Sequence, residues 1–136
     1  MNNEVIISPI FQMGNKKKLI NKGLTELFPK DINIFYDLFS GSAIVSMNTK
    51  AKKYVVNDIN LILYRLYQAF KTIQPEEIIN QVICNIEKFD LPRQGVKQNT
   101  KESEYYKPHY QLLRKYANTT RNIIDIYTCM FYAFSQ

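Results

Sequence analysis

Two aspartates carry the clearest chemical signal in the sequence. Asp37 lies near the end of an apolar run at residues 32–38, and Asp58 follows a second short apolar run at residues 54–57. They are separated by about 20 residues, the interval expected between neighbouring parallel strands of a nucleotide-binding βαβ unit. In such a unit the first turn approaches the ligand, and an acid after the second strand can hold a ribose. We therefore expect Asp37 and Asp58 to border one nucleotide-like ligand.

The turn between these acids narrows the class of ligand. A dinucleotide requires the pattern G-x-G-x-x-G, because its pyrophosphate must approach the backbone closely. Here the turn has only Gly41, with Ser42 and Ser46 at the other positions. S-adenosylmethionine has no pyrophosphate, so the sequence favours this ligand over a nicotinamide dinucleotide. The spacing alone equally allows that Asp37 and Asp58 merely cap helices.

The elements around the acids predict an α/β arrangement. Residues 5–13 begin extended, and helical spacing of apolar residues predicts a helix over residues 16–28 that Asn15 could cap. The run at residues 32–38 is almost continuously apolar, as a buried parallel strand usually is. A short helix at 43–48, a basic connection at 50–53 and a second strand at 54–57 follow. The amides before residue 17 would then face outward at a helix N-terminus, which favours an anionic group.

After Asp58 the alternation of strands and helices stops. Helices are predicted over residues 61–70, 75–86 and 105–116, with a polar loop over residues 90–104. Asn118, Thr119 and Thr120 would cap a last helix, which is apolar almost all round and should be buried. We therefore divide the chain into a cofactor-binding part, residues 1–60, and a helical region, residues 61–136.

Composition limits the remaining possibilities. The 136 residues carry a formal charge of +6, which favours a polyanionic partner. No apolar run approaches the ~20 residues of a membrane span, and no secretory signal is visible. Cys84 and Cys129 have no metal-ligand spacing and are expected to be buried, reduced thiols of a cytoplasmic protein. His109 has no acid or cysteine grouped with it as a metal site, which favours a packing or surface role.

Three short motifs resemble, in order and spacing, those of the Dam-like adenine-specific DNA methyltransferases. They are Phe11-Gln12-Met13-Gly14-Asn15-Lys16, Tyr36-Asp37-Leu38-Phe39-Ser40-Gly41-Ser42 and Asn57-Asp58-Ile59. Residues 110–135 are similar to the helical region that precedes the family's catalytic motif. The resemblance implies the N-terminal part of a Rossmann-like fold, S-adenosylmethionine as cofactor, and DNA as substrate, with the helical region belonging to a DNA-recognition insert.

The resemblance also implies roles for single residues. The cofactor-binding set would be Gln12, Lys16, Asp37, Phe39, Ser40, Gly41 and Asp58. The first two would contact the cofactor's carboxylate and neighbouring groups, Asp37 and the turn backbone would border its methionine, and Asp58 would take the ribose hydroxyls. Two positions depart from the family pattern: Gln12 replaces an aromatic residue, and Ser42 replaces a second glycine. Arg114, Lys115 and Arg121 are candidates for facing DNA, although a solvated helix face explains them equally well.

One family motif is absent. These enzymes hold the flipped adenine with an Asp-Pro-Pro-Tyr loop, whereas no two of the five prolines here are adjacent. We therefore expect an N-terminal fragment or truncated homologue that is inactive alone, and the apolar end of the chain suggests a cut end. Two strands would leave apolar surface exposed, so we also expect self-association. The alternative is a non-catalytic module that binds DNA or protein and retains the motifs as scaffold.

Overall fold

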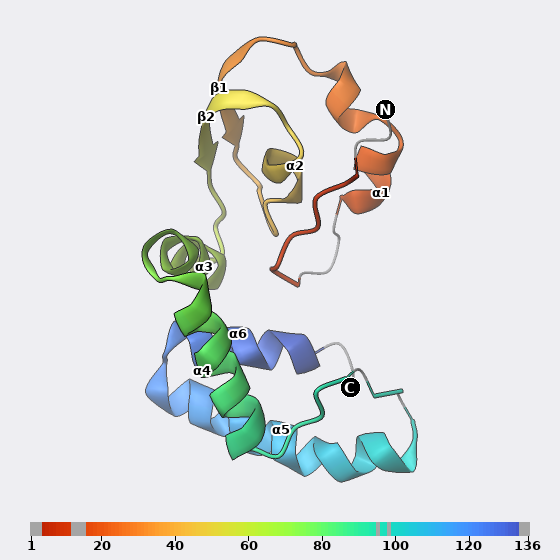
Figure 1. The fold of residues 1–136 in the computed structure, drawn as a ribbon, viewed down its shortest axis with the longest axis vertical. Coiled ribbons are helices and arrows are strands. Elements are labelled where there is room, and N and C mark those ends of the chain that lie inside the picture. Colours follow the sequence, from red (N-terminus) through yellow and green to blue (C-terminus); the bar gives the residue numbers. More distant parts are fainter. Residues whose placement is uncertain (1–3, 12–15, 95, 98, 134–136) are drawn as a thin grey trace. The chain divides into compact units, whose positions relative to one another are not determined.

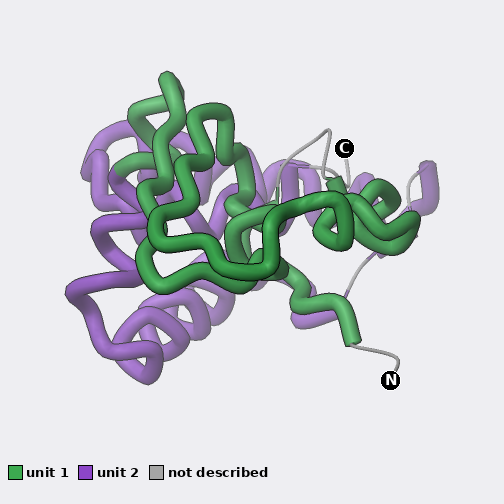
Figure 2. Tube along the Cα trace, turned by 90° about the horizontal axis from the view of Figure 1, so that it is seen from above, with its two compact units in different colours: residues 1–64 green, residues 65–136 purple. Residues whose placement is uncertain are grey.

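The computed structural model describes residues 4–11, 16–94, 96–97 and 99–133 (Figure 1). The chain divides into two compact units, Met1–Tyr64 and Arg65–Gln136 (Figure 2). The first contains the described strands, and the second contains helices. The architecture is therefore mixed α/β, with a small parallel sheet followed by a helical unit.

The sheet consists of β1 (Ile32–Asp37) and β2 (Ala51–Val56), which pair in parallel with Asp37 opposite Val56. A parallel pair needs a crossover connection, and here it contains the short helix α2 (Ile44–Met47), which packs against β1. The second strand begins earlier than predicted, because Lys52 and Lys53 belong to it rather than to a basic connection. Lysines are tolerated there because their side chains are exposed, and Lys52 Nζ donates to Asn33 Oδ1 at 2.9 Å.

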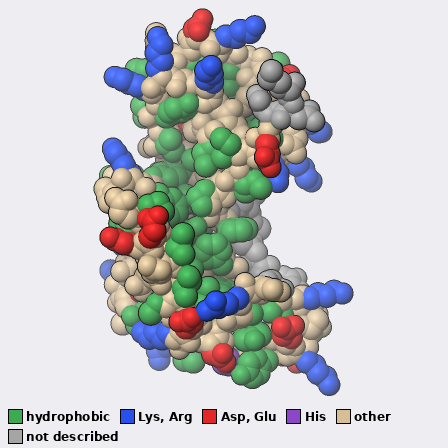
Figure 3. All heavy atoms as spheres, viewed as in Figure 1, with side chains coloured by type: hydrophobic (Ala, Val, Ile, Leu, Met, Phe, Trp, Pro, Cys, Tyr) green, Lys and Arg blue, Asp and Glu red, His purple; other side chains and the backbone are tan. Residues whose placement is uncertain are grey.

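The prediction that residues 32–38 form a buried strand is wrong for this chain. No residue of β1 is fully buried, and Ile34 and Tyr36 are 42% and 60% exposed. In β2, Tyr54 and Val55 are exposed as well. Figure 3 shows that hydrophobic side chains reach the surface among charged ones. Within the described residues the sheet has only two strands, so its apolar side chains lack the cover that a larger sheet supplies.

The first helix is shorter than predicted. Instead of one helix over residues 16–28, α1 (Lys17–Asn21) is followed by the 3₁₀ turn η1 (Leu24–Leu27). Gly23 separates them with a φ of 86°, a left-handed conformation that an α-helix cannot contain. Lys16 occupies the N-cap position without a side-chain cap, and the predicted cap, Asn15, lies outside the described residues. Residues 12–15 lie outside the described residues, so the anionic group expected at this helix start stays a prediction.

Four helices follow: α3 (Leu61–Thr72), α4 (Pro75–Lys88), α5 (Lys101–Thr120) and α6 (Ile123–Tyr132). The predicted loop over residues 90–104 is too long, because α5 begins at a capping box four residues before the predicted start. The Ser103 amide donates to Thr100 Oγ1 at 3.2 Å, and the Thr100 amide donates to Ser103 Oγ at 3.0 Å. Such a box satisfies two amides that a helix start leaves unpaired.

The cap predicted for the last helix at residues 118–120 is also wrong. These residues belong to α5, which ends where Arg121 adopts a φ of 52°. Asn122 caps α6 instead, since its Oδ1 accepts from the Ile124 amide at 2.8 Å. Asparagine and threonine both suit caps, and here the left-handed residue between them decides which one is used.

The last helix packs against both α4 and α5 (Figure 1), but it buries only four of its ten residues, so the prediction of a buried helix is confirmed in part. It buries Asp125 and Thr128 as well as apolar residues. Asn85 Nδ2 donates to Asp125 Oδ1 at 2.9 Å and to Thr128 Oγ1 at 3.1 Å. Thr120 Oγ1 donates to Asp125 Oδ2 at 2.8 Å, so this buried carboxylate is held by neutral donors from α4 and α5. Loss of one partner would leave a buried polar group unpaired, at a cost of about 1–3 kcal/mol.

The two cysteines differ in exposure, and the prediction that both are buried is wrong. Cys84 on α4 is exposed, whereas Cys129 on α6 is partly buried and packs beside Leu113 and Tyr110. His109 matches the packing role, because its Nδ1 lies 3.0 Å from the Phe89 carbonyl oxygen. No helix in the described part of the chain is long and apolar enough to cross a membrane.

The cysteines should therefore react at different rates. Burial raises the pKa of the Cys129 thiol to about 11, so this thiol stays protonated and unreactive through pH 9. We expect iodoacetamide to alkylate Cys84 rapidly and Cys129 slowly, as measured by mass spectrometry of proteolytic peptides. Both should react alike in concentrated urea, and equal rates in the folded chain would contradict the burial of Cys129.

Candidate functional site

Asp37 and Asp58 lie at the same edge of the sheet. Asp37 is the last residue of β1, and Asp58 is the second residue after β2. The strands are parallel, so their carboxyl ends meet, and the Asn57 amide continues the ladder by donating to the Asp37 carbonyl oxygen at 2.9 Å. In open α/β sheets, ligands bind outside the carboxyl ends of the strands.

The Asp58 carboxylate joins the two loops of this edge. Its Oδ2 accepts from the Gly41 amide at 2.9 Å, and its Oδ1 accepts from the Asn60 amide at 2.9 Å. Asn60 caps α3 by accepting from the Ile62 amide at 3.0 Å. Asp58 is therefore not the cap of that helix. It orients the loop after β1 relative to the loop after β2.

The Asp37 carboxylate is fixed in another way. Its Oδ2 accepts from Ser46 Oγ at 2.7 Å, and Ser46 is a buried residue within α2. The N-cap of α2 is Ala43, which makes no side-chain cap bond. Neither aspartate caps a helix, so the alternative that they are only caps does not hold. Nothing in the sequence around Ser46 indicated its role, because a serine in a short helix is common.

The turn after β1, residues 38–43, is tightly wound. Gly41 and Ala43 have φ values of 54° and 58°, in the left-handed region. The Ser40 amide and hydroxyl donate to the Asn57 carbonyl oxygen at 3.0 and 2.7 Å. The Ala43 amide donates to the Ser40 carbonyl oxygen at 2.7 Å. Because Gly41 has no side chain, its backbone can adopt this conformation without steric cost.

The N-terminal segment is tied to the same turn and to α2. Ser8 Oγ donates to the Ser42 carbonyl oxygen at 2.5 Å. Asn48 holds Ile6 twice, accepting from its amide at 2.8 Å and donating to its carbonyl oxygen at 2.9 Å. The extended segment that precedes the first motif is therefore anchored in the unit that contains Asp37 and Asp58. Sequence reasoning did not identify Ser8 or Asn48, since neither belongs to a motif.

The other residues assigned to the cofactor differ in their surroundings. Ser40 is buried, whereas Phe39 is 91% exposed beside it. Ile59, which follows Asp58, is 99% exposed. Lys16 is exposed directly before α1, and Gln12 lies outside the described residues. Carboxylates, turn amides and exposed apolar side chains thus gather around one sheet edge, a combination suited to a ligand with both hydroxyls and apolar surface.

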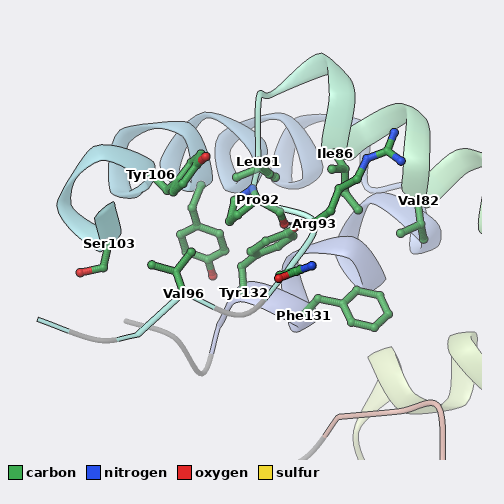
Figure 4. A pocket seen from close by; sticks show the side chains of 12 residues that line it. Val82, Ile86, Leu91, Pro92, Arg93, Val96, Ser103, Tyr106, Phe131 and Tyr132 are labelled. Carbon is green, nitrogen blue, oxygen red and sulfur yellow. Dashed lines mark hydrogen bonds between the residues drawn. The ribbon is translucent and has the colours of Figure 1, made fainter. Parts of the chain in front are cut away.

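A cavity of about 300 Å³ lies in the helical unit (Figure 4). Apolar and aromatic side chains dominate its lining, among them Leu91, Tyr106 and Tyr132. Two of its polar side chains are engaged: Tyr132 Oη donates to the Pro92 carbonyl oxygen at 2.9 Å, and Arg93 pairs with Glu87 at 2.6 Å. It is not built from the strand-end acids, and we assign it no ligand.

The three candidates for DNA contact do not form one group. Arg114 and Lys115 are exposed residues of α5. Arg121 ends that helix, and its carbonyl oxygen accepts from Arg65 Nη2 at 2.7 Å. We therefore keep Arg114 and Lys115 as neighbours on one helix and separate Arg121 from them.

Comparison with known proteins defines the class to which this arrangement belongs. The sequence pattern described as D12 class N6 adenine-specific DNA methyltransferase matches residues 13–136. The chain belongs to this family, which confirms the resemblance drawn from the three motifs.

Two curated relatives are similar to the chain. The modification methylase StsI of Streptococcus sanguinis is 35% identical over 130 residues, which are 96% of this chain and 18% of the relative. The type II methyltransferase M.FokI of Planomicrobium okeanokoites is 32% identical over 133 residues, which are 98% of this chain and 19% of the relative. The chain thus spans less than a fifth of the length of these relatives.

The left-handed turn yields a paired prediction. Replacing Gly41 by alanine should lower the free energy of unfolding by about 1–2 kcal/mol, because a Cβ is disfavoured at that φ. Ala43→Gly is the matched control and should be neutral or stabilising, because it removes a Cβ from an equally strained position. Urea denaturation followed by circular dichroism measures both changes. Equal destabilisation by the two substitutions would contradict the turn conformation.

Proposed function

We propose that the sheet edge around Asp37 and Asp58 binds S-adenosylmethionine. The observation that carries this proposal is the hydrogen bonding of Asp58. Each of its oxygens accepts one amide hydrogen at 2.9 Å, which leaves further lone pairs on both oxygens. A carboxylate that is oriented but not saturated suits the two adjacent hydroxyls of a ribose.

The remaining residues would hold the other parts of the cofactor. Asp37 and the main chain at Phe39, Ser40 and Gly41 would border the methionine, with Asp37 fixed by Ser46. Lys16 and Gln12 would contact the methionine carboxylate and neighbouring groups. When bound, the cofactor supplies an electrophilic methyl group on sulfonium sulfur. The chain's own part is to orient the cofactor through the bonds that lock residues 38–43 to Asn57 and Asp58.

At the level of fold, we infer that residues 1–60 form the N-terminal part of a Rossmann-like methyltransferase domain. The parallel pair, the crossover through α2 and the acids at the strand ends support this inference. Residues 61–136 would then be a helical region that belongs to a DNA-recognition insert. Its basic α5 supports that part of the proposal.

The activity we propose for the whole enzyme is methyl transfer to the exocyclic amine of adenine in duplex DNA. The family and the names of the two modification methylases support a place in restriction-modification, in the cytoplasm. The 136 residues contain no Asp-Pro-Pro-Tyr, so we propose that they do not transfer methyl groups alone. The reading frame beyond Gln136 tests this: that motif within about one hundred further codons, a distance typical of domain sizes, would support the enzyme. A stop codon at that point would favour a non-catalytic module.

The cofactor site predicts the effect of a single substitution. Asp58→Ala should weaken S-adenosylmethionine binding at least tenfold, because a hydrogen bond to a charged group contributes about 1.5–3 kcal/mol. Isothermal titration calorimetry on the complete gene product measures the affinity. Asp31→Ala is a matched control, since Asp31 is an exposed aspartate before β1, and it should bind as the unaltered protein does.

Two further measurements distinguish loss of the cofactor contact from loss of the fold. Circular dichroism should show that Asp58→Ala retains its helices, because the Asp58–Gly41 bond also has a structural role. Asp58→Asn keeps one acceptor oxygen and should bind with intermediate affinity. An unchanged affinity for Asp58→Ala, or no binding by the unaltered protein, would overturn the site and favour the non-catalytic module.

The exposed apolar residues of the sheet support a second property, self-association. Ile34, Tyr36, Tyr54 and Val55 are all exposed, and strand edges pair readily with other chains. We expect the 136-residue chain to elute from a size-exclusion column as a dimer or larger species as its concentration rises. Tyr36→Lys places a charge on the sheet and should shift the chain toward monomer, whereas Tyr64→Lys, outside the sheet, should not. A concentration-independent monomer would refute self-association.

A further inference from the structure

The outward face of α5 has an unusual composition for a solvated helix. From Tyr105 to Ile124 the chain contains no acidic residue, while it contains Lys107, Arg114, Lys115 and Arg121. The acids of α5, Glu102 and Glu104, lie in its first turn. The helix is twenty residues long, which corresponds to about 30 Å.

Four polar side chains on this face form a row along the helix. Gln111, Arg114, Lys115 and Asn118 are spaced by three, four and seven residues, so they line one side of the helix. All four are exposed, whereas Tyr110, Leu113 and Ala117 on the other side are buried. These four residues border a shallow hollow together with Thr119. We call them the α5 stripe.

No hydrogen bond or ion pair among the described residues engages the side chains of the α5 stripe, although Thr119 Oγ1 donates to the Lys115 carbonyl oxygen at 3.0 Å. The exposed face of α4 differs. It mixes Glu76, Glu77 and Glu87 with Lys88, and Glu87 pairs with Arg93 at 2.6 Å. Mixed charges and local pairs of that kind are typical of a helix that faces only water.

We infer that the α5 stripe docks in the major groove of duplex DNA, where Gln111, Arg114 and Asn118 read base edges. An α-helix fits this groove, and the amides of asparagine and glutamine pair bidentately with adenine while arginine pairs bidentately with guanine. Gln111, Arg114 and Asn118 supply these three groups along two turns of one helix. The inference rests on the proposed function, because it gives the DNA substrate a specific contact surface.

The lysines of the same face have a different role. Lys107 and Lys115 lie on either side of Gln111, each about 6 Å along the helix axis, and both are exposed. A lysine is a point charge without the planar fork of arginine, which suits phosphate oxygens better than base edges. They would fix the position of the helix on the duplex, and the amides and Arg114 would determine the sequence.

This division predicts two separable phenotypes. The 136-residue chain and the complete gene product are each used to select from a pool of randomised DNA duplexes, and the bound fraction is sequenced. Asn118→Ala should relax the preference at one base pair, removing a discrimination of about tenfold, with little change in the salt dependence of binding. Lys115→Ala should leave the selected sequence unchanged and reduce the slope of log affinity against log salt by about 1.

Asn80→Ala is the matched control, because Asn80 is exposed on α4 and should alter neither quantity. The inference would be overturned if neither unaltered protein selected a sequence. It would also be overturned if the base preferences and salt slopes were identical for Asn118→Ala, Lys115→Ala and Asn80→Ala. The Asp58→Ala variant separates the two proposals, since a failed cofactor site leaves this selection unaffected. If the unaltered protein binds the cofactor but selects no DNA sequence, the inference about the α5 stripe is refuted and the proposed cofactor site is not.

Discussion

The parallel pairing of β1 with β2 is the constraint on which the candidate site depends. It brings the carboxyl ends of two strands together, so two aspartates that are distant in sequence come to border one edge. The Asp58 carboxylate then accepts the Gly41 amide, which holds the left-handed turn after β1 against the loop after β2. Ser46 fixes Asp37 from within the crossover helix. An antiparallel pair of the same sequence would place these acids at opposite ends of the strands.

Sequence patterns identified the parts of the site that depend on chemistry and spacing. The interval between the acids and the single-glycine turn predicted that Asp37 and Asp58 lie at one edge of the sheet, because a βαβ unit allows few other arrangements. The partners that orient these groups were not predictable in the same way. Ser8, Ser46 and Asn48 are ordinary polar residues, and their roles arise from contacts between segments 9 to 42 residues apart.

Element boundaries and burial were predicted less well, for physical reasons that differ from one case to the next. The strand at residues 32–38 was correct in place and wrong in burial, because an apolar strand is buried only when other elements cover it. Gly23 ended the first helix early, and the Thr100–Ser103 capping box started α5 early. Asp125 is buried in a helix that otherwise looks apolar, and only tertiary contact with Asn85 and Thr120 explains it.

The central claim is that the edge bordered by Asp37 and Asp58 is the cofactor site of this methyltransferase family member. Nuclear magnetic resonance tests it most directly: amide resonances of the ¹⁵N-labelled chain are followed during titration with S-adenosylmethionine. The account predicts that the largest shifts fall on residues 38–43 and 57–60, with the amides of α4 to α6 unchanged. Shifts confined to the helical unit, or none at millimolar cofactor, would contradict it.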